Sequence, residues 1–294
     1  MHKYLSAIGL NRSVDENRLS EYINQALNTS PAVYHCINSE SVSYVEFRYI
    51  MNSGLGIAVR GYYDLMDEFH VDYYYPIFEA TEISAIGNSY EIERFKDKES
   101  YCGICDDSRL GVTLVFYLQN ALDLISKRKE SGSGDTWNIC LSALSVEGKI
   151  ILPVKQRYYF EDELELLRDD NERRSSLVAA ARNGDEQAFE SLTMEDMDIY
   201  ALISQRVERE DVLSIVDTTF IPYGVESDVY SIIGTIEDVE DIINPLTLDL
   251  VYIMSVKCND VTFPVAINKR DLEGVPKRGR RFRGVIWMQG NIII

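Results

Sequence analysis

Two cysteines with the spacing of a redox or zinc motif are the first residues that could do chemistry. Tyr101-Cys102-Gly103-Ile104-Cys105 is a C-x-x-C, in which two thiolates can converge on each other or on one metal ion. A structural zinc needs four ligands, and the sequence holds no second pair with metal spacing. Asp106 and Asp107 follow directly and favour a raised thiol pKa, which opposes a thioredoxin-like site. We expect two thiols in a turn or strand end, and retain Cys102 and Cys105 as a weak redox or metal candidate.

No other group of residues supports catalysis. The chain has three histidines, and no G-x-S-x-G motif accompanies them as a Ser–His–Asp hydrolase would require. Gly54-Leu55-Gly56 lacks the glycine spacing and the following helix of a nucleotide loop, so a hairpin turn explains it. The acidic clusters at 162–165, 195–198 and 237–241 are typical of a solvated surface. We assign no catalytic residue, no cofactor and no metal ligand. An enzymatic function stays open but is less favoured than a binding function.

One basic concentration interrupts the acidic chain, with five cations within seven residues at the entry to an aromatic-containing strand. Its possible partner or nucleic-acid contacts are Lys277, Arg278, Arg280, Arg281, Arg283 and Trp287. Basic residues beside aromatics on a small barrel are what single-strand binders use. The alternatives are a protein partner, solvated side chains, or a contact with the acidic segment of the same chain. Alternation of Phe282, Ile286 and Met288 as a core face predicts that Arg281 and Arg283 are exposed.

Tyrosines gather in the N-terminal part of the chain and form a possible aromatic interaction surface. Its members are Tyr62, Tyr63, Tyr73, Tyr74 and Tyr75. Strand alternation sends Tyr73 and Tyr75 to one face and Tyr74 to the other. One face must be core, and the other can contact a partner, since tyrosine is favoured at interfaces. Packing within the protein is the alternative for all five.

Composition excludes several classes of function. The 294 residues are 46% hydrophobic and carry a formal net charge of −19, which describes an acidic globular protein with a sizeable core. This balance opposes duplex wrapping and binding to an anionic membrane, because both need a positive surface. No apolar run is long enough for a membrane span. An odd number of cysteines in a large chain indicates reduced thiols, so we expect a cytoplasmic protein.

Hydrophobic periodicity predicts an α+β protein. Ser13 and Glu16 form a capping-box pattern before a helix over 14–27. In the N-terminal half we expect strands over 42–51, 55–63, 69–79, 89–95 and 100–104, a helix over 110–129, and a hairpin over 137–155. Towards the C-terminus we expect strands over 212–221, 227–239, 247–257, 261–267 and 281–289. Gly234 lies mid-strand, where a long strand can bend between two sheets.

These elements suggest three parts. Residues 1–158 form an α+β domain with an antiparallel sheet, and 159–210 form an acidic helical connector. Within the connector, Arg182-Asn183-Gly184 suits a helix end and Thr193 suits the N-cap of the next helix. Residues 211–294 carry five strands with a bent one near the start, which predicts a small OB-like β-barrel.

Three blocks of sequence carry a family likeness. They are the start MHKYLSAIG at 1–9, the stretch from ARNGDEQAF to TTFIPYG at 181–224, and the ending GRRFRGVIWMQG at 279–290. Together they resemble a domain-of-unknown-function family of cytoplasmic proteins from clostridial Firmicutes, of roughly 290 residues like this chain. The resemblance implies a bacterial cytoplasmic protein. It carries no activity, ligand or functional residue over to this sequence.

The acidic surface, the tyrosines and the lack of a catalytic constellation favour a non-enzymatic binding or adaptor protein that contacts another protein. A nucleic-acid-associated module using the basic strand of the barrel is the alternative. An enzyme or redox protein with a site near Cys102 and Cys105 is the third hypothesis.

Overall fold

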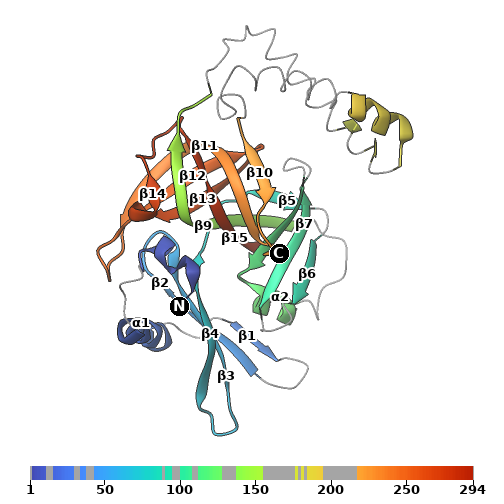
Figure 1. The fold of residues 1–294 in the computed structure, drawn as a ribbon. Helices are drawn as coiled ribbons and strands as arrows, with labels where there is room; N and C mark the ends of the chain where they lie inside the picture. Colours follow the sequence, from blue (N-terminus) through green and yellow to red (C-terminus); the bar gives the residue numbers. More distant parts are fainter. Residues whose placement is uncertain are drawn as a thin grey trace. The chain divides into compact units, whose positions relative to one another are not determined.

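The protein forms two compact units, residues 1–151 together with 218–294, and residues 152–217. The computed structural model describes residues 2–10, 16–29, 34–37, 43–87, 90–94, 100–107, 112–127, 137–154, 176–177, 180–181, 184–194 and 217–293. The larger unit contains all the numbered strands and helices of Figure 1, and it is mostly β.

The first sheet of the larger unit is antiparallel and follows chain order. Its four strands are β1 (Tyr34–Ile37), β2 (Ser43–Ile50), β3 (Leu55–Tyr63) and β4 (Phe69–Phe78). β-branched and aromatic residues make up most of β2, and the hairpin partner predicted over 55–63 is β3. Helix α1 (Glu16–Thr29) contacts β2 and β3 and buries Leu19 and Tyr22. The helix predicted over 14–27 is confirmed in its described part, and its capping residue Ser13 lies outside the described residues.

The second sheet has eleven strands among the described residues. They are β5 (Ala85–Gly87), β6 (Tyr90–Arg94), β7 (Tyr101–Asp107), β8 (Val112–Leu118), β9 (Trp137–Ile151), β10 (Thr219–Pro222), β11 (Val229–Ile243), β12 (Leu250–Cys258), β13 (Val261–Asn268), β14 (Leu272–Glu273) and β15 (Arg281–Ile293). Helix α2 (Ala121–Lys127) and two 3-10 helices, Lys3–Ile8 and Lys269–Asp271, complete the unit. No helix in the described part of the chain is long and apolar enough to cross a membrane.

Five strands of this sheet close into a barrel, visible in the upper half of the larger unit in Figure 1. Their ring order is β11–β12–β13–β9–β15, and β15 returns to β11. β9 and β13 run parallel, whereas the other neighbours are antiparallel. Met254, Phe263, Phe282, Ile286 and Met288 belong to the buried cluster of this barrel. Their burial confirms that Phe282, Ile286 and Met288 form a core face.

Strand β11 pairs with three neighbours, and on one of its edges the partner changes beside a glycine. On that edge residues 230–233 pair with β10 and residues 235–243 pair with β12, whereas residues 229–235 pair with β15 on the other edge. A Cβ at Gly234 would overlap the Val256 side chain and crowd the backbone carbonyl of Lys257. Only glycine allows this close approach, which agrees with the predicted bend at Gly234.

Two predicted elements are wrong. Residues 137–155 do not form a hairpin, because β9 runs unbroken from Trp137 to Ile151 and pairs with β15 almost throughout. The predicted turn glycine, Gly148, serves packing, since a Cβ there would overlap the Phe282 ring. Residues 110–129 are not one helix either. Their first half contains β8, where Leu114, Phe116 and Leu118 alternate into the core, and within the described residues 112–127 the helix is limited to α2.

The position of β9 joins the two parts that the sequence separated. The predicted boundary near residue 158 leaves β9 in the N-terminal domain and four barrel strands in the C-terminal one. In the structure β9 is the barrel strand between β13 and β15. Residues 1–151 and 218–294 therefore share one unit. A linear reading of the chain cannot show this, because sheet pairing joins strands that the acidic segment separates by more than sixty residues.

The smaller unit is described at 152–154, 176–177, 180–181, 184–194 and 217, so most of the predicted connector at 159–210 lies outside the described residues. Residues 186–194 are helical. Gly184 has a φ of +89° and donates its N–H to the Ala181 carbonyl, which fits the predicted helix end. Thr193 lies inside this helix, where its hydroxyl donates to the Phe189 carbonyl, and the next helix that it was predicted to cap lies outside the described residues. The capping residue is Asp185, whose carboxylate accepts the N–H groups of Gln187 and Ala188.

Candidate functional site

The hairpin formed by β3 and β4, residues 55–78, is the feature that best fits a functional role. We call it the β3–β4 arm. Its root lies against the barrel, and its turn points away from the barrel at the lower end of Figure 1. Residues near the root are buried, whereas β4 becomes exposed towards the turn. The root, the side and the tip of the arm each have a distinct chemistry.

A buried ion cluster lies at the root of the arm. Glu46 on β2 and Arg60 on β3 are direct cross-strand neighbours, and both side chains are wholly buried. The Arg60 Nε donates to Glu46 Oε2, and the Arg48 Nε donates to Glu46 Oε1 over 2.6 Å. Burial by itself raises the pKa of the Glu46 carboxyl, but the two guanidinium groups outweigh it and hold this pKa below its usual value. Glu46 is therefore a charged side chain in the protein interior.

The second arginine extends the cluster to the surface. Arg48 donates through Nη1 to Glu79, whose side chain is 32% exposed, and through Nη2 to the Gln119 carbonyl over 2.8 Å. Two arginines thus face two carboxylates, so the cluster is formally neutral. Buried charges are tolerated where opposite charges and hydrogen bonds compensate them in this way.

Amide side chains connect the cluster to the barrel. The Gln119 Nε2 donates to the Phe78 carbonyl and to Gln289 Oε1, each over 2.8 Å. Gln289 also accepts the Phe78 N–H and donates to the Pro76 carbonyl. The Ser142 hydroxyl donates to Phe78 over 2.6 Å. These bonds replace a neighbouring strand along the root of β4 and fix the arm to β9 and β15.

Three tyrosines surround the buried cations. The Tyr75 hydroxyl donates to Glu46 Oε2 over 2.9 Å, and Arg60 donates to the Tyr73 hydroxyl over 2.9 Å. The Tyr117 hydroxyl lies 3.4 Å from that of Tyr73. Burial raises the pKa of all three phenols, so they stay protonated. Tyr73 and Tyr75, which the sequence places on one face of the strand, therefore line the core and make hydrogen bonds there.

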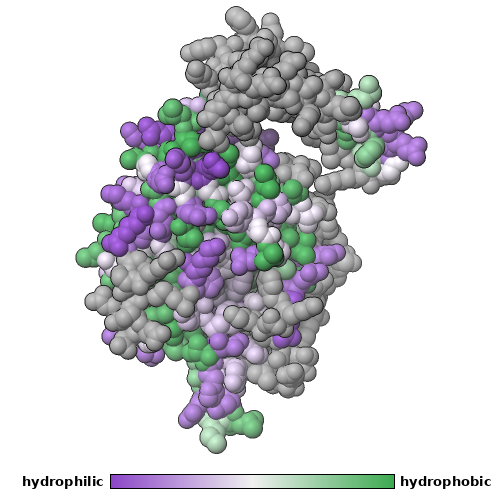
Figure 2. Space-filling view, viewed as in Figure 1, coloured by the Kyte–Doolittle hydropathy of each residue, from purple (hydrophilic) through white to green (hydrophobic). Residues whose placement is uncertain are grey.

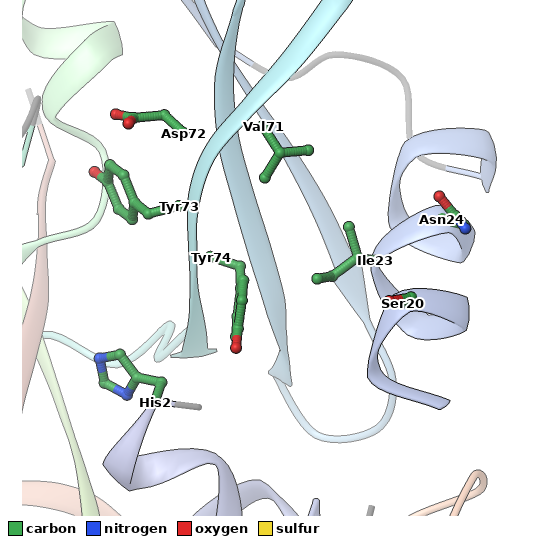
Figure 3. A pocket seen from close by; sticks show the side chains of 8 residues that line it. All are labelled: His2, Ser20, Ile23, Asn24, Val71, Asp72, Tyr73 and Tyr74. Atoms are coloured by element: carbon green, nitrogen blue, oxygen red, sulfur yellow. The ribbon is translucent and has the colours of Figure 1, made fainter. Parts of the chain in front are cut away.

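A shallow pocket of about 560 Å³ lies beside the arm, between β4, α1 and the N-terminus. In Figure 3, Tyr74 and Val71 point to the side of β4 that faces α1, whereas Tyr73 and Asp72 point to the other side. Ile23 of α1 points towards β4, and His2, which also lines the pocket, lies below Tyr74 in this view. The strand alternation predicted for Tyr73 and Tyr74 is confirmed, and Tyr74 lines this pocket.

The tip of the arm is a turn held by one carboxylate. The Asp64 Oδ1 accepts the N–H groups of Met66 and Glu68 over 2.8 and 2.9 Å. Its Oδ2 lies 2.8 Å from His70 Nε2. The Asp64 N–H also donates to the Glu68 carbonyl. Hydrogen bonding to His70 is the main cause that lowers the pKa of Asp64, so this carboxylate stays ionised and holds the turn.

This turn presents two large apolar side chains to solvent. Leu65 and Met66 are 107% and 84% exposed, and Val71 on β4 is 44% exposed. Apolar colour marks the end of the arm at the bottom of Figure 2. Asp64, Asp67, Glu68 and Asp72 make the same segment acidic. Single exposed apolar residues are ordinary, but two adjacent ones on a hydrogen-bonded tip form a defined feature.

Trp287 lies in an aromatic cluster where the barrel meets the N-terminus. Its ring packs on those of Tyr4, His2 and Tyr117 at centroid distances of 5.0 to 5.3 Å. Its Nε1 donates to Asp228 Oδ2 over 2.7 Å. Trp287 is 6% exposed, so it offers no face on which a nucleic-acid base could stack. The predicted contact role of Trp287 is therefore corrected to a packing role.

The basic stretch is divided between surface and interior. Lys277, Arg278 and Arg283 are exposed, and Arg280 is partly buried and donates to the Val275 carbonyl. Arg281 is 3% exposed, which contradicts its predicted exposure. It precedes the core residue Phe282 at the start of β15, where the strand pairs on one side with β9 and on the other with β11. Both edges of the strand are hydrogen-bonded there, and the alternation of side chains between its two faces did not reveal that Arg281 is buried.

The C-x-x-C cysteines do not form a joint site. Cys102 and Cys105 both lie on β7, three residues apart, so their side chains point to opposite faces of the strand. Both are buried free thiols, and the Cys102 thiol donates to the Glu93 carbonyl. Burial is the main cause that raises the pKa of Cys102, which makes it a weak nucleophile. Among the described residues, the group of side chains that could hold a metal ion is Asp64, Glu68 and His70, not the two cysteines.

The remaining tyrosines of the predicted surface lie near the tip. Tyr63 is 36% exposed, and Tyr62 is half-buried and stacks on His70 with ring centroids 5.5 Å apart. Sequence reasoning missed Glu46, Arg48 and Arg60. The lone Arg60 in the apolar run of β3 was the available signal, because an unpaired cation in a buried strand requires a partner.

Comparison with known proteins identifies the chain at the level of a family. A family model described as "Domain of unknown function, E. rectale Gene description (DUF3881)" matches residues 5–290, which is nearly the whole chain. The resemblance drawn from the three sequence blocks to a domain-of-unknown-function family of this length is thereby confirmed. Neither the curated proteins nor the solved structures gave a match.

Proposed function

The chain belongs to the DUF3881 family, and we propose that it is a non-enzymatic binding protein that docks on a partner protein through the tip of its β3–β4 arm. The observation that carries this proposal is the exposure of Leu65 and Met66 on a turn whose backbone is fixed by Asp64. A few side chains that fill pockets near the centre of an interface supply most of its binding energy, and methionine is enriched at interfaces.

The arm is suited to docking because little order has to be created on binding. The Asp64 carboxylate fixes the turn, and the Gln289 side chain fixes the root of β4 to the barrel strand β15. The Glu46–Arg60 pair ties β3 to β2. Association loses free energy wherever a flexible loop must be ordered, so a rigid presentation of Leu65 and Met66 favours affinity.

The partner's chemistry follows from the residues around the tip. Asp64, Asp67 and Glu68 lie in the turn, Asp72 follows on β4, and the segment 63–72 contains no lysine or arginine. A complementary surface is an apolar pocket bordered by lysine or arginine. An anionic membrane is a poor fit for the same tip, because its charge repels four acidic side chains.

Photocrosslinking from the tip tests the proposal directly. A benzophenone amino acid at position 65 in the native host should give one dominant crosslinked protein. The matched control is position 225, because Val225 is an equally exposed apolar residue in a loop of the barrel, with 102% exposure. The crosslinked protein is then purified and its affinity measured against the wild type.

The expected result is that Leu65→Ser with Met66→Ser weakens binding of the purified partner about 30-fold or more, the effect of losing one interface hot spot. Val225→Ser should leave the affinity unchanged. Circular dichroism and the unfolding midpoint should not move in either variant, because neither site packs in the core. Wild-type affinity in the Leu65→Ser, Met66→Ser variant, or equal crosslinking from position 225, would overturn the proposal.

A nucleic-acid role for the barrel is the second candidate, and one observation supports it. Lys277, Arg278 and Arg283 are exposed on and beside β15. The burial of Arg281 and Trp287 weakens it, because cations alone give only salt-sensitive backbone contacts. Binding of labelled single-stranded oligonucleotides at low salt, lost on replacing the three exposed cations by serine, would favour this candidate over the arm.

The proposal also includes the type of barrel and the cellular location of the protein. We take the barrel to be OB-like. Its five strands and its closure support this, and so does the long strand β11, which pairs with both β12 and β15. We also place the protein in the cytoplasm, on the strength of its odd number of cysteines.

A further inference from the structure

We propose that Asp64, Glu68 and His70 form a binding site for a divalent transition-metal ion at the base of the arm's tip. One ligand atom of each residue lies within 4.8 Å of the other two. The inference rests on this geometry alone and does not depend on the docking function of the arm.

Two of the ligands are already oriented. The backbone N–H groups of Met66 and Glu68 occupy Asp64 Oδ1, which leaves Oδ2 directed at His70 Nε2 over 2.8 Å. The Tyr62 ring lies against the imidazole of His70 at an interplanar angle of 25°, which fixes the ring plane. Support of this kind around metal-binding residues strengthens affinity, because the ligands need not be ordered on binding.

The third ligand can reach the ion by side-chain rotation. Zinc and similar ions bind nitrogen and oxygen at about 2.1 Å, so their ligand atoms lie closer together than the 4.8 Å limit seen here. The Glu68 side chain is exposed, and its backbone N–H and carbonyl are fixed by Asp64. Rotation about its own side-chain bonds therefore brings the carboxylate in without a backbone change.

Electrostatics favours a cation at this position. Asp64 and Glu68 place two carboxylates close together, and Asp67 and Asp72 add negative charge nearby in the chain. His70 compensates one of these charges only when protonated. A divalent ion relieves the repulsion between the carboxylates and accepts the neutral imidazole as a ligand. The mixture of one imidazole with two carboxylates selects Mn²⁺, Fe²⁺, Co²⁺ or Zn²⁺ over Ca²⁺ and Mg²⁺, which prefer oxygen ligands.

The bound ion would link the turn to strand β4. It would connect Asp64, which directly precedes the exposed Leu65 and Met66, with His70 on β4. The expected consequence is a stiffer tip and a lower rate of hydrogen exchange at the backbone amides of 65–68 when the metal is present.

Calorimetric titration of the full-length, tag-free protein with Zn²⁺, and separately with Mn²⁺, tests the site. We expect one ion per chain with a micromolar dissociation constant. His70→Gln and Glu68→Gln should each weaken binding about tenfold or more. His2→Gln, a control elsewhere in the chain, should bind as the wild type does. Asp67→Asn, which removes a nearby charge but no ligand atom, should weaken binding less than either ligand substitution. Asp64 is not substituted in this test, because it also holds the turn.

Zinc binding that survives both His70→Gln and Glu68→Gln would place the ion elsewhere and overturn the proposal, and so would an absence of heat at millimolar metal. The docking proposal is read separately, from the crosslink at position 65 in the presence of a chelator. A chelated protein that still crosslinks its partner, combined with a failed titration, would remove the metal site and leave the docking function standing.

Discussion

Glu46 and Arg60 are direct cross-strand neighbours on β2 and β3, and they form an ion pair in which neither side chain is exposed to solvent. Most charged residues lie on protein surfaces, because removing a charge from water is costly unless a partner and hydrogen bonds compensate it. Here Arg48, Tyr75 and the Gln119 carbonyl supply those further contacts. The pair ties β3 of the arm to β2, and through Gln119 it contacts the second sheet.

Replacing Glu46 by glutamine should lower the free energy of unfolding by about 3–5 kcal/mol, because Arg60 then keeps a buried charge without a counterion. The measurement is urea unfolding followed by circular dichroism. Glu79→Gln is the matched control: it also removes a carboxylate from Arg48, but at a partly exposed position, and should cost about 1 kcal/mol or less. Equal losses of unfolding free energy in the two variants would show that the buried Glu46 contributes no more to stability than the partly exposed Glu79.

Acid should remove the contribution of Glu46. Its pKa in the folded protein is lower than the value of 4.5 for a free glutamate, so the folded state binds its proton less readily than the unfolded state. The stabilisation is therefore complete above about pH 4.5 and is lost as the pH falls through the folded-state pKa. The difference in unfolding free energy between wild type and Glu46→Gln should therefore stay constant above about pH 4.5 and shrink as the pH falls below that value. A difference that grows as the pH falls would mean that the pKa of Glu46 is raised.

Local sequence patterns predicted most strands of this protein, and the reason is visible in β2 to β4. Alternating β-branched and aromatic residues, followed by Asn52-Ser53-Gly54, specify a hairpin without help from the rest of the chain. β9 shows the opposite case. Its Glu147-Gly148-Lys149 segment has turn chemistry, yet pairing with β15 and the packing of Phe282 against Gly148 keep it extended.

The candidate site was less predictable, because burial depends on what covers a strand from outside. Glu46 and Arg48 alternate with Val45 and Phe47, which is the pattern of a strand with one face exposed to solvent. All four are buried, since the second face of the sheet also packs within the protein. The Asp64–His70 contact crosses a turn, and its spacing of six residues matches no common sequence motif.

The buried cysteines should resist modification in the native protein. Cys102, Cys105, Cys140 and Cys258 are buried free thiols, and burial is the main cause that raises the pKa of Cys258 to about 12. In a Cys36→Ser variant, an aromatic disulfide reagent should react slowly with the folded protein and rapidly with four thiols in urea. Rapid loss of two thiols in the folded state under mild oxidation, absent in Cys102→Ser, would restore the redox hypothesis for the C-x-x-C.

Two tyrosine-to-phenylalanine changes should have opposite effects on stability. The Tyr4 hydroxyl is buried without a hydrogen-bond partner among the described residues, whereas the Tyr75 hydroxyl donates to the charged Glu46. Removing the first relieves an unmet desolvation penalty, so Tyr4→Phe should raise the free energy of unfolding by about 1 kcal/mol. Removing the second breaks a hydrogen bond to a charged group, so Tyr75→Phe should lower it by about 1.5–3 kcal/mol. Urea unfolding of both variants gives the two changes in unfolding free energy. They can be compared directly, because each substitution removes one hydroxyl group. A Tyr4→Phe protein that is less stable than the wild type would mean that this hydroxyl has a partner, such as an ordered water between Tyr4 and the nearby Asp228.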